Sequence, residues 1–173
     1  MTMTSSFSTY LFKKEGNVWD VAIHVPKAEA EKLTDLIDKR VLCTINNQVT
    51  IHAALMPQGN GDFFINTNKE IRNKLRLAIN DKAKVTLAKD DSKYGMPLPE
   101  ELKTAWELDP EGHQVFHTLT IGKQRSLIHV IGKPKSTEIR IRKALIVLEY
   151  LRSVNGKFDF KELNEAFKLS NQK

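Results

Sequence analysis

Two histidines, His113 and His117, are the clearest pair of potential metal ligands in the sequence. Residues four apart on a helix share one face and can bind a metal ion together. The glutamate that would make the pair a metallohydrolase motif is replaced by Gln114. A third ligand would have to come from His129 or from a distant acid. We therefore expect no metal site and no cofactor, and we interpret these histidines as capping or surface residues.

The most concentrated charge lies between Lys123 and Lys143, where Glu138 is the single acid among the basic residues. A helix is predicted to begin in this segment, and a helix start offers free backbone amides to an anion. We therefore predict a small-anion site formed by Arg125, Arg140, Arg142 and Lys143. A duplex fits less well, because Arg142 points away from the side shared by its two neighbours. A nucleic-acid or other polyanion binder that uses this segment is the alternative.

No catalytic residue stands out elsewhere. Cys43 is predicted on the inward side of a strand, where an unreactive core thiol is expected. The acid pairs Asp90-Asp91 and Glu100-Glu101 suit a strand end and a helix start. The sequence contains no phosphate-binding loop, dinucleotide-binding glycine pattern or nucleophile elbow. An enzyme is therefore the weaker alternative.

The elements that must position these groups begin with an alternating pattern. Hydrophobic residues recur at odd positions through much of the first ninety residues, which is typical of half-buried strands. With residues 10–13, about six strands result. Such a sheet is expected to close on itself, because closure removes its exposed edges. Residues 1–90 are therefore predicted to form a small, partly open or closed antiparallel β-barrel, with a core that includes Trp19, Val21, Ile23, Val41, Cys43, Ile45, Ile51 and Leu55.

The connections of this barrel have their own signals. Pairing Ile45 with Val49 leaves a three-residue loop that starts with two asparagines. Pro26 marks the start of one short helix, and Asn68 can cap a second helix over 69–77. Residues 57–61 form a glycine-bearing loop that is predicted to be a rim or lid. If the barrel held a ligand, its pocket would be lined by Trp19, His24, His52 and Phe64, although a packed core is the expectation we favour.

The second half of the chain has a helical period. Residues 91–99 contain two prolines and a glycine and are predicted to be a linker. Residues 100–173 are predicted to form a small helical bundle, and the fold class is therefore α+β. Asp159 and Glu162 form a capping-box pattern at the start of the last helix. The expected helices span 99–108, 111–119, 122–131 and 136–154, followed by this last one.

Composition limits the function classes. The chain has 173 residues, of which 40% are hydrophobic and 28% charged, which is typical of a folded protein. No segment approaches the roughly 18 uncharged apolar residues of a membrane-spanning helix. The N-terminal residues lack the pattern of a secretory signal, and one cysteine permits no internal disulfide. We therefore expect a cytoplasmic protein. The formal net charge of +6 suits a polyanion only modestly, because acids interrupt most basic stretches.

Three motifs of the first half match a known pattern. They are the strand and helix start from Trp19 to Pro26, the loop Gly59-x-Gly61, and Asn68-Lys69-x-Ile71-Arg72. In these residues the N-terminal half resembles a small bacterial barrel domain of unknown function. The glycine in the last turn of that domain is replaced here by Asn80.

The second half carries a different set of motifs: Pro97-x-Pro99-x-x-Leu102, Phe116-x-x-Leu119, Gln124-Arg125 with Ile128 and Ile131, and Thr137-x-x-Arg140-x-Arg142. In these it resembles the bacteriocin-protection family, also called YdeI or OmpD-associated. A tryptophan of that family is replaced by Val130, and its alanine-lysine pair by Gly132-Lys133. The resemblance implies a bacterial protein that is linked to bacteriocin protection and has no established catalytic activity.

Together these observations predict a non-catalytic binding or interaction module. Its partner is expected to be a small anionic ligand or a protein, and nucleic acid is the less favoured partner. The weaker enzyme alternative would place its pocket at the mouth of the barrel.

Overall fold

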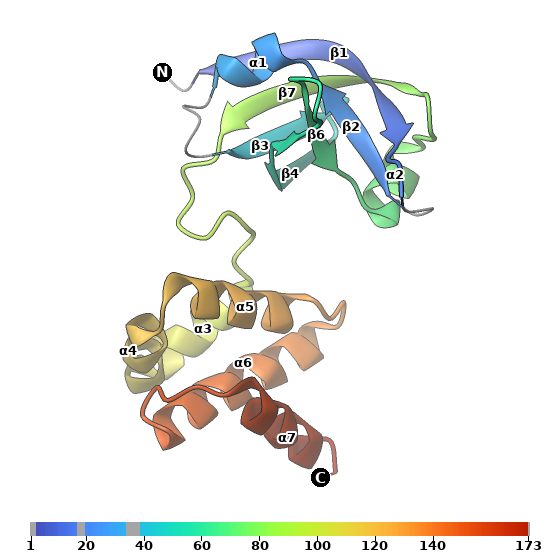
Figure 1. The fold of residues 1–173 in the computed structure, drawn as a ribbon. Coiled ribbons are helices and arrows are strands. Elements are labelled where there is room, and N and C mark those ends of the chain that lie inside the picture. The colour runs from blue at the N-terminus through green and yellow to red at the C-terminus, as the bar shows by residue number, and fades with distance from the viewer. Residues whose placement is uncertain (1–2, 17–19, 34–38, 173) are drawn as a thin grey trace. The chain divides into compact units, whose positions relative to one another are not determined.

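The computed structural model describes residues 3–16, 20–33 and 39–172 of the chain. Its internal contacts divide the chain into two units (Figure 1). The first unit, Met1–Gly95, is called the β unit below, and the second, Met96–Lys173, is called the helical unit. A β unit followed by a helical unit confirms the predicted α+β class.

The β unit is built on one antiparallel sheet with the strand order β4-β3-β7-β1-β2-β6-β5. Among the described residues the sheet has seven strands, where about six were predicted; the additional one, β5, has only two residues. The strands are β1 (Thr4–Lys13), β2 (Val21–Val25), β3 (Arg40–Ile45), β4 (Val49–Ala54), β5 (Met56–Pro57), β6 (Phe63–Asn66) and β7 (Lys82–Lys89).

Strand β1 takes part in both halves of this sheet. Its residues 4–10 pair with β7, whereas residues 11–13 pair with β2. The two edge strands, β4 and β5, are separated in sequence by Leu55 alone, and this side chain is 1% exposed. The sheet is therefore a curled half-barrel whose edges are joined by the chain itself (Figure 1).

The predicted inward parity is confirmed for most of the strands. The fully buried side chains of the sheet include Ile23, Ile45 and Ile65, all at odd positions. Ile51 packs against the same core but is only partly buried, because it lies on the edge strand β4. Trp19 lies outside the described residues. The buried core comprises Leu11, Val21, Ile23, Val25, Ala30, Leu33, Val41, Cys43, Ile45, Leu55, Ile65, Leu75, Ala83, Val85 and Leu87.

The connections follow local chemistry. Ile45 pairs with Val49, as predicted, and the two asparagines after Ile45 adopt left-handed φ angles of 51° and 55°. Helix α1 (Lys27–Glu31) follows Pro26. Helix α2 (Lys69–Leu75) is capped by Asn68, whose side chain accepts a hydrogen bond from the third residue of the helix. It ends two residues earlier than predicted, because Arg76 turns left-handed with a φ of 54°.

The helical unit is arranged around its longest helix, α6 (Thr137–Ser153). Helices α3, α4, α5 and α7 all pack against α6 (Figure 1). Gly112 lets α4 approach closely, since a Cβ atom there would lie 2.9 Å from the Cβ atom of Leu148 on α6. The other helices are α3 (Glu100–Leu108), α4 (Pro110–Thr118), α5 (Ile121–Gly132) and α7 (Phe160–Ser170). A bundle of five helices was predicted, and these five form the described part of the unit.

The start of α7 differs from the predicted capping box. Asp159 accepts hydrogen bonds from the N–H groups of Lys161 and Glu162, as a cap should. Glu162 does not complete the box, because its carboxylate accepts a hydrogen bond from the Tyr150 hydroxyl at 2.8 Å. The same hydroxyl accepts a bond from the N–H of Asp159 at 3.1 Å. The hydroxyl of Tyr150 on α6 therefore accepts the hydrogen bond from the N–H of Asp159 that the Glu162 carboxylate would accept in a capping box.

Across the described ranges, no helix has the length and apolar character that crossing a membrane requires.

We predict that Ile23→Ala lowers the free energy of unfolding by about 2–5 kcal/mol, because it empties a fully buried position. Ile79→Ala is the matched control, since this side chain is 43% exposed and should cost less than about 0.5 kcal/mol. Denaturant titration followed by circular dichroism measures both. Equal, small losses would show that Ile23 is not in the core.

Candidate functional site

Of the four side chains predicted to line a barrel pocket, the structure describes His24, His52 and Phe64, and these three do not meet inside the sheet. His24 and Phe64 are paired across β2 and β6, His52 lies on β4, and Trp19 is outside the described residues. Even positions of these strands face away from the odd-numbered core, whose side chains fill the inside of the sheet. The prediction that His24 and Phe64 line a pocket inside the sheet is therefore wrong, because both side chains belong to the outer face.

Aromatic rings form a row across this outer face. The ring of Tyr10 stacks on the ring of His24, with 5.0 Å between centroids and 11° between planes. Phe12 packs edge-to-face against Tyr10 at 6.3 Å and against Phe64 at 6.5 Å. Tyr10 nevertheless remains 45% exposed. We call Tyr10, Phe12, His24 and Phe64 the aromatic face.

A carboxylate holds the His24 ring within the aromatic face. Asp62 Oδ2 lies 3.0 Å from His24 Nε2, and Asp62 Oδ1 accepts a hydrogen bond from the backbone N–H of Lys27. These bonds, with that of His24 contributing most, hold the pKa of Asp62 below its usual value. Asp62 follows the glycine-bearing loop that was predicted to be a rim or lid. The end of this loop is therefore tied to β2 and to the start of α1.

Lysines border the aromatic face on both sides. Lys14 Nζ lies 4.6 Å from the centre of the Phe64 ring. On the opposite side, the exposed Lys82 of β7 is the partner of Tyr10, and the exposed Lys84 follows on the same face. Flat rings that can stack and ammonium groups that can bind an anion are thus combined on one surface.

His52 has a separate partner at the end of β7. Its Nδ1 lies 2.7 Å from Oδ2 of Asp90, which is 1% exposed. Burial acts to raise the pKa of Asp90, but hydrogen bonds from Ser92 and His52 outweigh burial and hold this pKa below its usual value. The pair ties the exit of β7 to the edge strand β4, and we interpret it as structural.

Arg140, a predicted anion-binding residue, is engaged within the helical unit. Its Nε and Nη2 atoms lie 2.9 and 2.7 Å from Oε1 of Glu101. It also donates to the carbonyls of Pro134 and Lys135 and to the hydroxyl of Thr137. The hydrogen bond from Arg140 lowers the pKa of Glu101. The guanidinium therefore fastens the start of α6 to α3.

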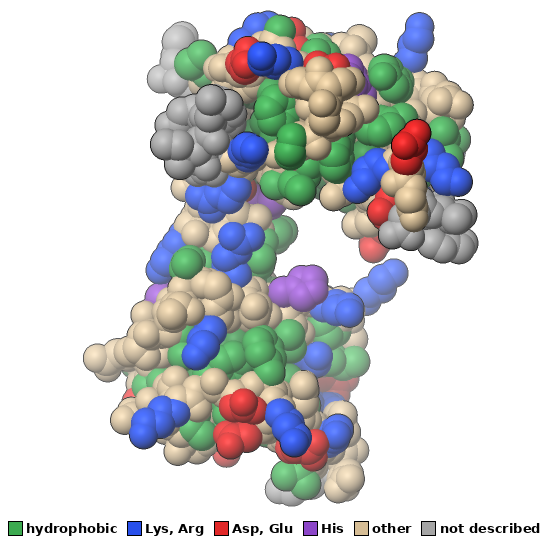
Figure 2. Space-filling model, in the orientation of Figure 1, with side chains coloured by type: hydrophobic (Ala, Val, Ile, Leu, Met, Phe, Trp, Pro, Cys, Tyr) green, Lys and Arg blue, Asp and Glu red, His purple; other side chains and the backbone are tan. Residues whose placement is uncertain are grey.

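The four predicted anion-binding residues do not converge. Arg125, Arg140 and Arg142 line three different grooves of the helical unit. Lys143 Nζ lies 5.1 Å from the centre of the Phe167 ring. On the face shown in Figure 2, Lys and Arg side chains are spread over both units and are interspersed with acidic ones. The Lys123–Lys143 segment thus supplies separate contacts instead of one basic surface.

His113 and His117 share a face of α4, as their spacing predicts, and pack around Trp106. The rings of His113 and Trp106 stack with 4.8 Å between centroids, and His117 lies 5.0 Å from the same indole. His117 Nδ1 donates to the carbonyl of His113 at 2.9 Å. Within the described part of the chain, no three His, Cys, Asp or Glu residues are grouped to hold a metal ion. The two histidines belong to the packing between α3 and α4.

The single cysteine lies in the core of the β unit. Cys43 is fully buried, and this burial raises the pKa of its thiol to about 12. The thiol is therefore protonated at neutral pH and shielded from reagents.

Tyr10 and Phe12 are functional candidates that the sequence pattern alone does not single out. The signal was present, because both occupy even positions, like His24 and Phe64. Even positions alone do not show that the four rings share a face, because that depends on how the strands pair. The observed pairing of Leu11 with Ile23 places the even positions of β1 and β2 on the same face.

We predict that Asp90→Asn destabilises the β unit by about 1–3 kcal/mol, because an amide cannot replace a charged acceptor in a buried network. Asp91→Asn is the matched control, since the Asp91 side chain is 74% exposed. Because folding lowers the pKa of Asp90, its contribution is complete above the usual value of 3.8 and disappears as pH falls through the folded-state pKa. The difference between the unmodified protein and Asp90→Asn, measured by denaturant titration, should therefore shrink in acid. A constant difference would contradict this assignment.

We also predict that Arg140→Ala lowers the melting temperature of the helical unit more than Arg142→Ala does. Arg140 joins α3 to α6 through Glu101, whereas Arg142 makes exposed contacts, at 3.5 Å to Glu138 on its own helix and at 3.4 Å to Asn171 after α7. Differential scanning calorimetry of both variants measures the two effects. Equal shifts would argue against a structural role for Arg140.

Comparison with known proteins adds one match. Residues 7–87 are similar to a family described as a domain of unknown function (DUF1905). No curated protein and no solved structure matches the chain. The match lies within the β unit, and the resemblance of the second half to the bacteriocin-protection family stays a prediction.

Proposed function

We propose that the chain is a non-catalytic binding module whose β unit binds a flexible single strand of nucleic acid on the aromatic face. The observation that carries this proposal is the row of rings across β1, β2 and β6, bordered by Lys14, Lys82 and Lys84. Stacking on rings and charge attraction to phosphates are the two interactions that such proteins combine.

The exposure of Tyr10 supports stacking, whereas the other three rings of the aromatic face are partly buried. Tyr10 is 45% exposed, and at the other end of the row Met56, the partner of Phe64, is 42% exposed. A hydrogen bond from the His24 ring to Asp62, together with the ring contacts, holds His24 behind Tyr10, so the tyrosine ring is already oriented before a ligand arrives. A fixed ring loses less conformational entropy when a base stacks on it.

The form of the surface favours a single strand over a duplex. The aromatic face lies on the outside of a curled sheet, so a rigid double helix would meet a convex surface. The faces of its bases are stacked on one another and cannot reach the rings. A single strand can follow the curvature and turn its bases toward the protein. The formal net charge of +6 attracts single-stranded and double-stranded nucleic acid alike.

We predict that Tyr10→Ala weakens the binding of fluorescently labelled oligothymidine or oligouridine by about 5- to 150-fold, because one stacked base contributes about 1–3 kcal/mol. Fluorescence anisotropy measures the dissociation constants. Phe160→Ala is the matched control, since Phe160 is an aromatic residue of α7 that is 41% exposed. It should bind as the unmodified protein does.

Salt dependence tests the lysines in the same assay. The double variant Lys82→Gln and Lys84→Gln should reduce the slope of log affinity against log salt by about 1.4, since each phosphate contact of a single strand contributes about 0.7. Equal affinity for duplex and single strand would contradict the proposal. An unchanged affinity of a folded Tyr10→Ala variant would contradict it as well.

A further inference from the structure

One side of α6 carries exposed hydrophobic residues. Ile141 and Leu145 are 46% and 47% exposed and lie about 40° apart around the helix. Leu145 lies about 160° around α6 from the buried Val147, whereas Ile141 lies at the edge of the buried side, about 20° from Leu148. Leu108, at the end of α3, is 75% exposed and lines the same groove as Ile141 and Leu145. These three exposed side chains are the apolar part of a groove that is also lined by Glu100, Glu101, Thr104 and Thr137.

The charges on this side of α6 are ordered about Leu145. Glu138 and Arg142 precede it by seven and three residues, and Glu149 and Arg152 follow it by four and seven. All four lie within about 60° of Leu145 around the helix. Reversing the helix direction about Leu145 therefore places each acidic position close to a basic one. The charges of one copy of α6 are therefore complementary to those of a second, antiparallel copy centred on the same residue.

We propose that this side of α6 is the interface of a homodimer, in which two copies pack α6 antiparallel about a two-fold axis at Leu145. Glu138 then faces the partner's Arg152, and Arg142 faces the partner's Glu149. A two-fold axis forms each of these ion pairs twice. Leu145 packs on its own counterpart, with Ile141 and Leu108 at the sides. This interface lies in the helical unit and does not depend on nucleic-acid binding by the β unit.

The charge order identifies a second copy as the occupant. An unrelated helix would require complementary charges, but it would not require an order that inverts about the centre of the interface. The internal partners of these charges leave them accessible. Arg142 and Glu138 are 3.5 Å apart, with side chains 46% and 83% exposed. Arg152 bonds Asp109 at 3.0 Å and keeps 39% of its side chain exposed.

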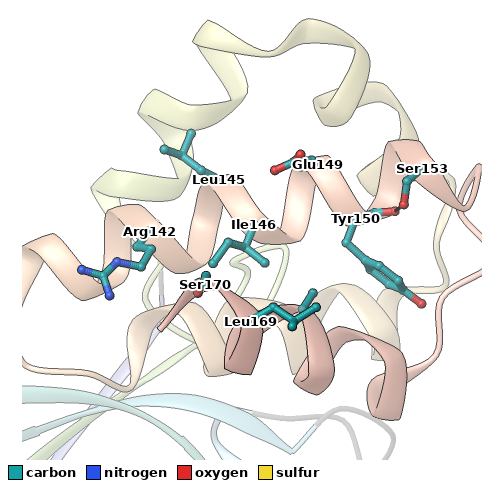
Figure 3. A pocket seen from close by; sticks show the side chains of 9 residues that line it. Arg142, Leu145, Ile146, Glu149, Tyr150, Ser153, Leu169 and Ser170 are labelled. Carbon is teal, nitrogen blue, oxygen red and sulfur yellow. Dashed lines mark hydrogen bonds between the residues drawn. The ribbon is translucent and has the colours of Figure 1, made fainter. Parts of the chain in front are cut away.

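Grooves on both sides of α6 suit this packing. The groove between α6 and α7 has a volume of about 510 Å³, and Leu169, which lines it, is 64% exposed. Figure 3 shows Arg142 and Glu149 on α6 at either side of Leu145 along the helix. The groove toward α3 has a volume of about 420 Å³. A ridge between two grooves is the form that helix-on-helix packing uses.

Sedimentation velocity of the whole chain over a concentration series tests the proposal. The unmodified protein should show a monomer–dimer equilibrium. Leu145→Asp introduces two charges at the axis and should raise the dissociation constant by about 100-fold or more. Ile139→Asp is the matched control, because Ile139 is 42% exposed on the same helix but about 120° away from Leu145. It should dimerise normally.

A charge exchange distinguishes this interface from any other. Arg142→Glu should weaken the dimer by placing like charges opposite each other, and adding Glu149→Arg should restore it. Circular dichroism establishes that the variants are folded. A protein that is monomeric at every concentration would overturn the proposal. So would a dimer that tolerates Leu145→Asp or that is not restored by the charge exchange.

Discussion

The sharing of β1 between two halves of one sheet is the constraint on which the β unit depends. Residues 4–10 bond to β7 and residues 11–13 bond to β2, so the sheet must curl around Leu11. The curl brings the two edge strands, β4 and β5, together, and the buried Leu55 connects them in sequence. It also places Tyr10 and Phe12 on the convex side. Core and candidate site are therefore two faces of the same strands.

The alternation of side chains explains why the candidate site lies outside the barrel. His24 sits between Ile23 and Val25, both of which are fully buried. A strand that fills the core with odd residues must turn its even residues outward. The interior is consequently packed, and the polar and aromatic groups collect where Asp62 and Tyr10 can hold His24.

In the helical unit, the position of each charge around α6 decides its use. Arg140 lies beside α3, where Glu101 neutralises it, so it acts as a fastening between helices. Arg142 and Glu149 lie on the exposed side, away from the buried stripe. The segment that is most basic in sequence is thereby divided among structural and surface roles. Its charges do not add up to a single anion site.

The sequence by itself determined the α+β class, the odd-numbered core, the caps Asn68 and Asp159 and the asparagine turn after Ile45. These features depend on side-chain period and on hydrogen bonds between near neighbours, so a local pattern is sufficient. Only the tertiary structure decided the pairs His24–Asp62 and Arg140–Glu101 and the joining of Tyr10 to His24. Their members lie far apart in sequence, and strand register and helix packing alone bring them together.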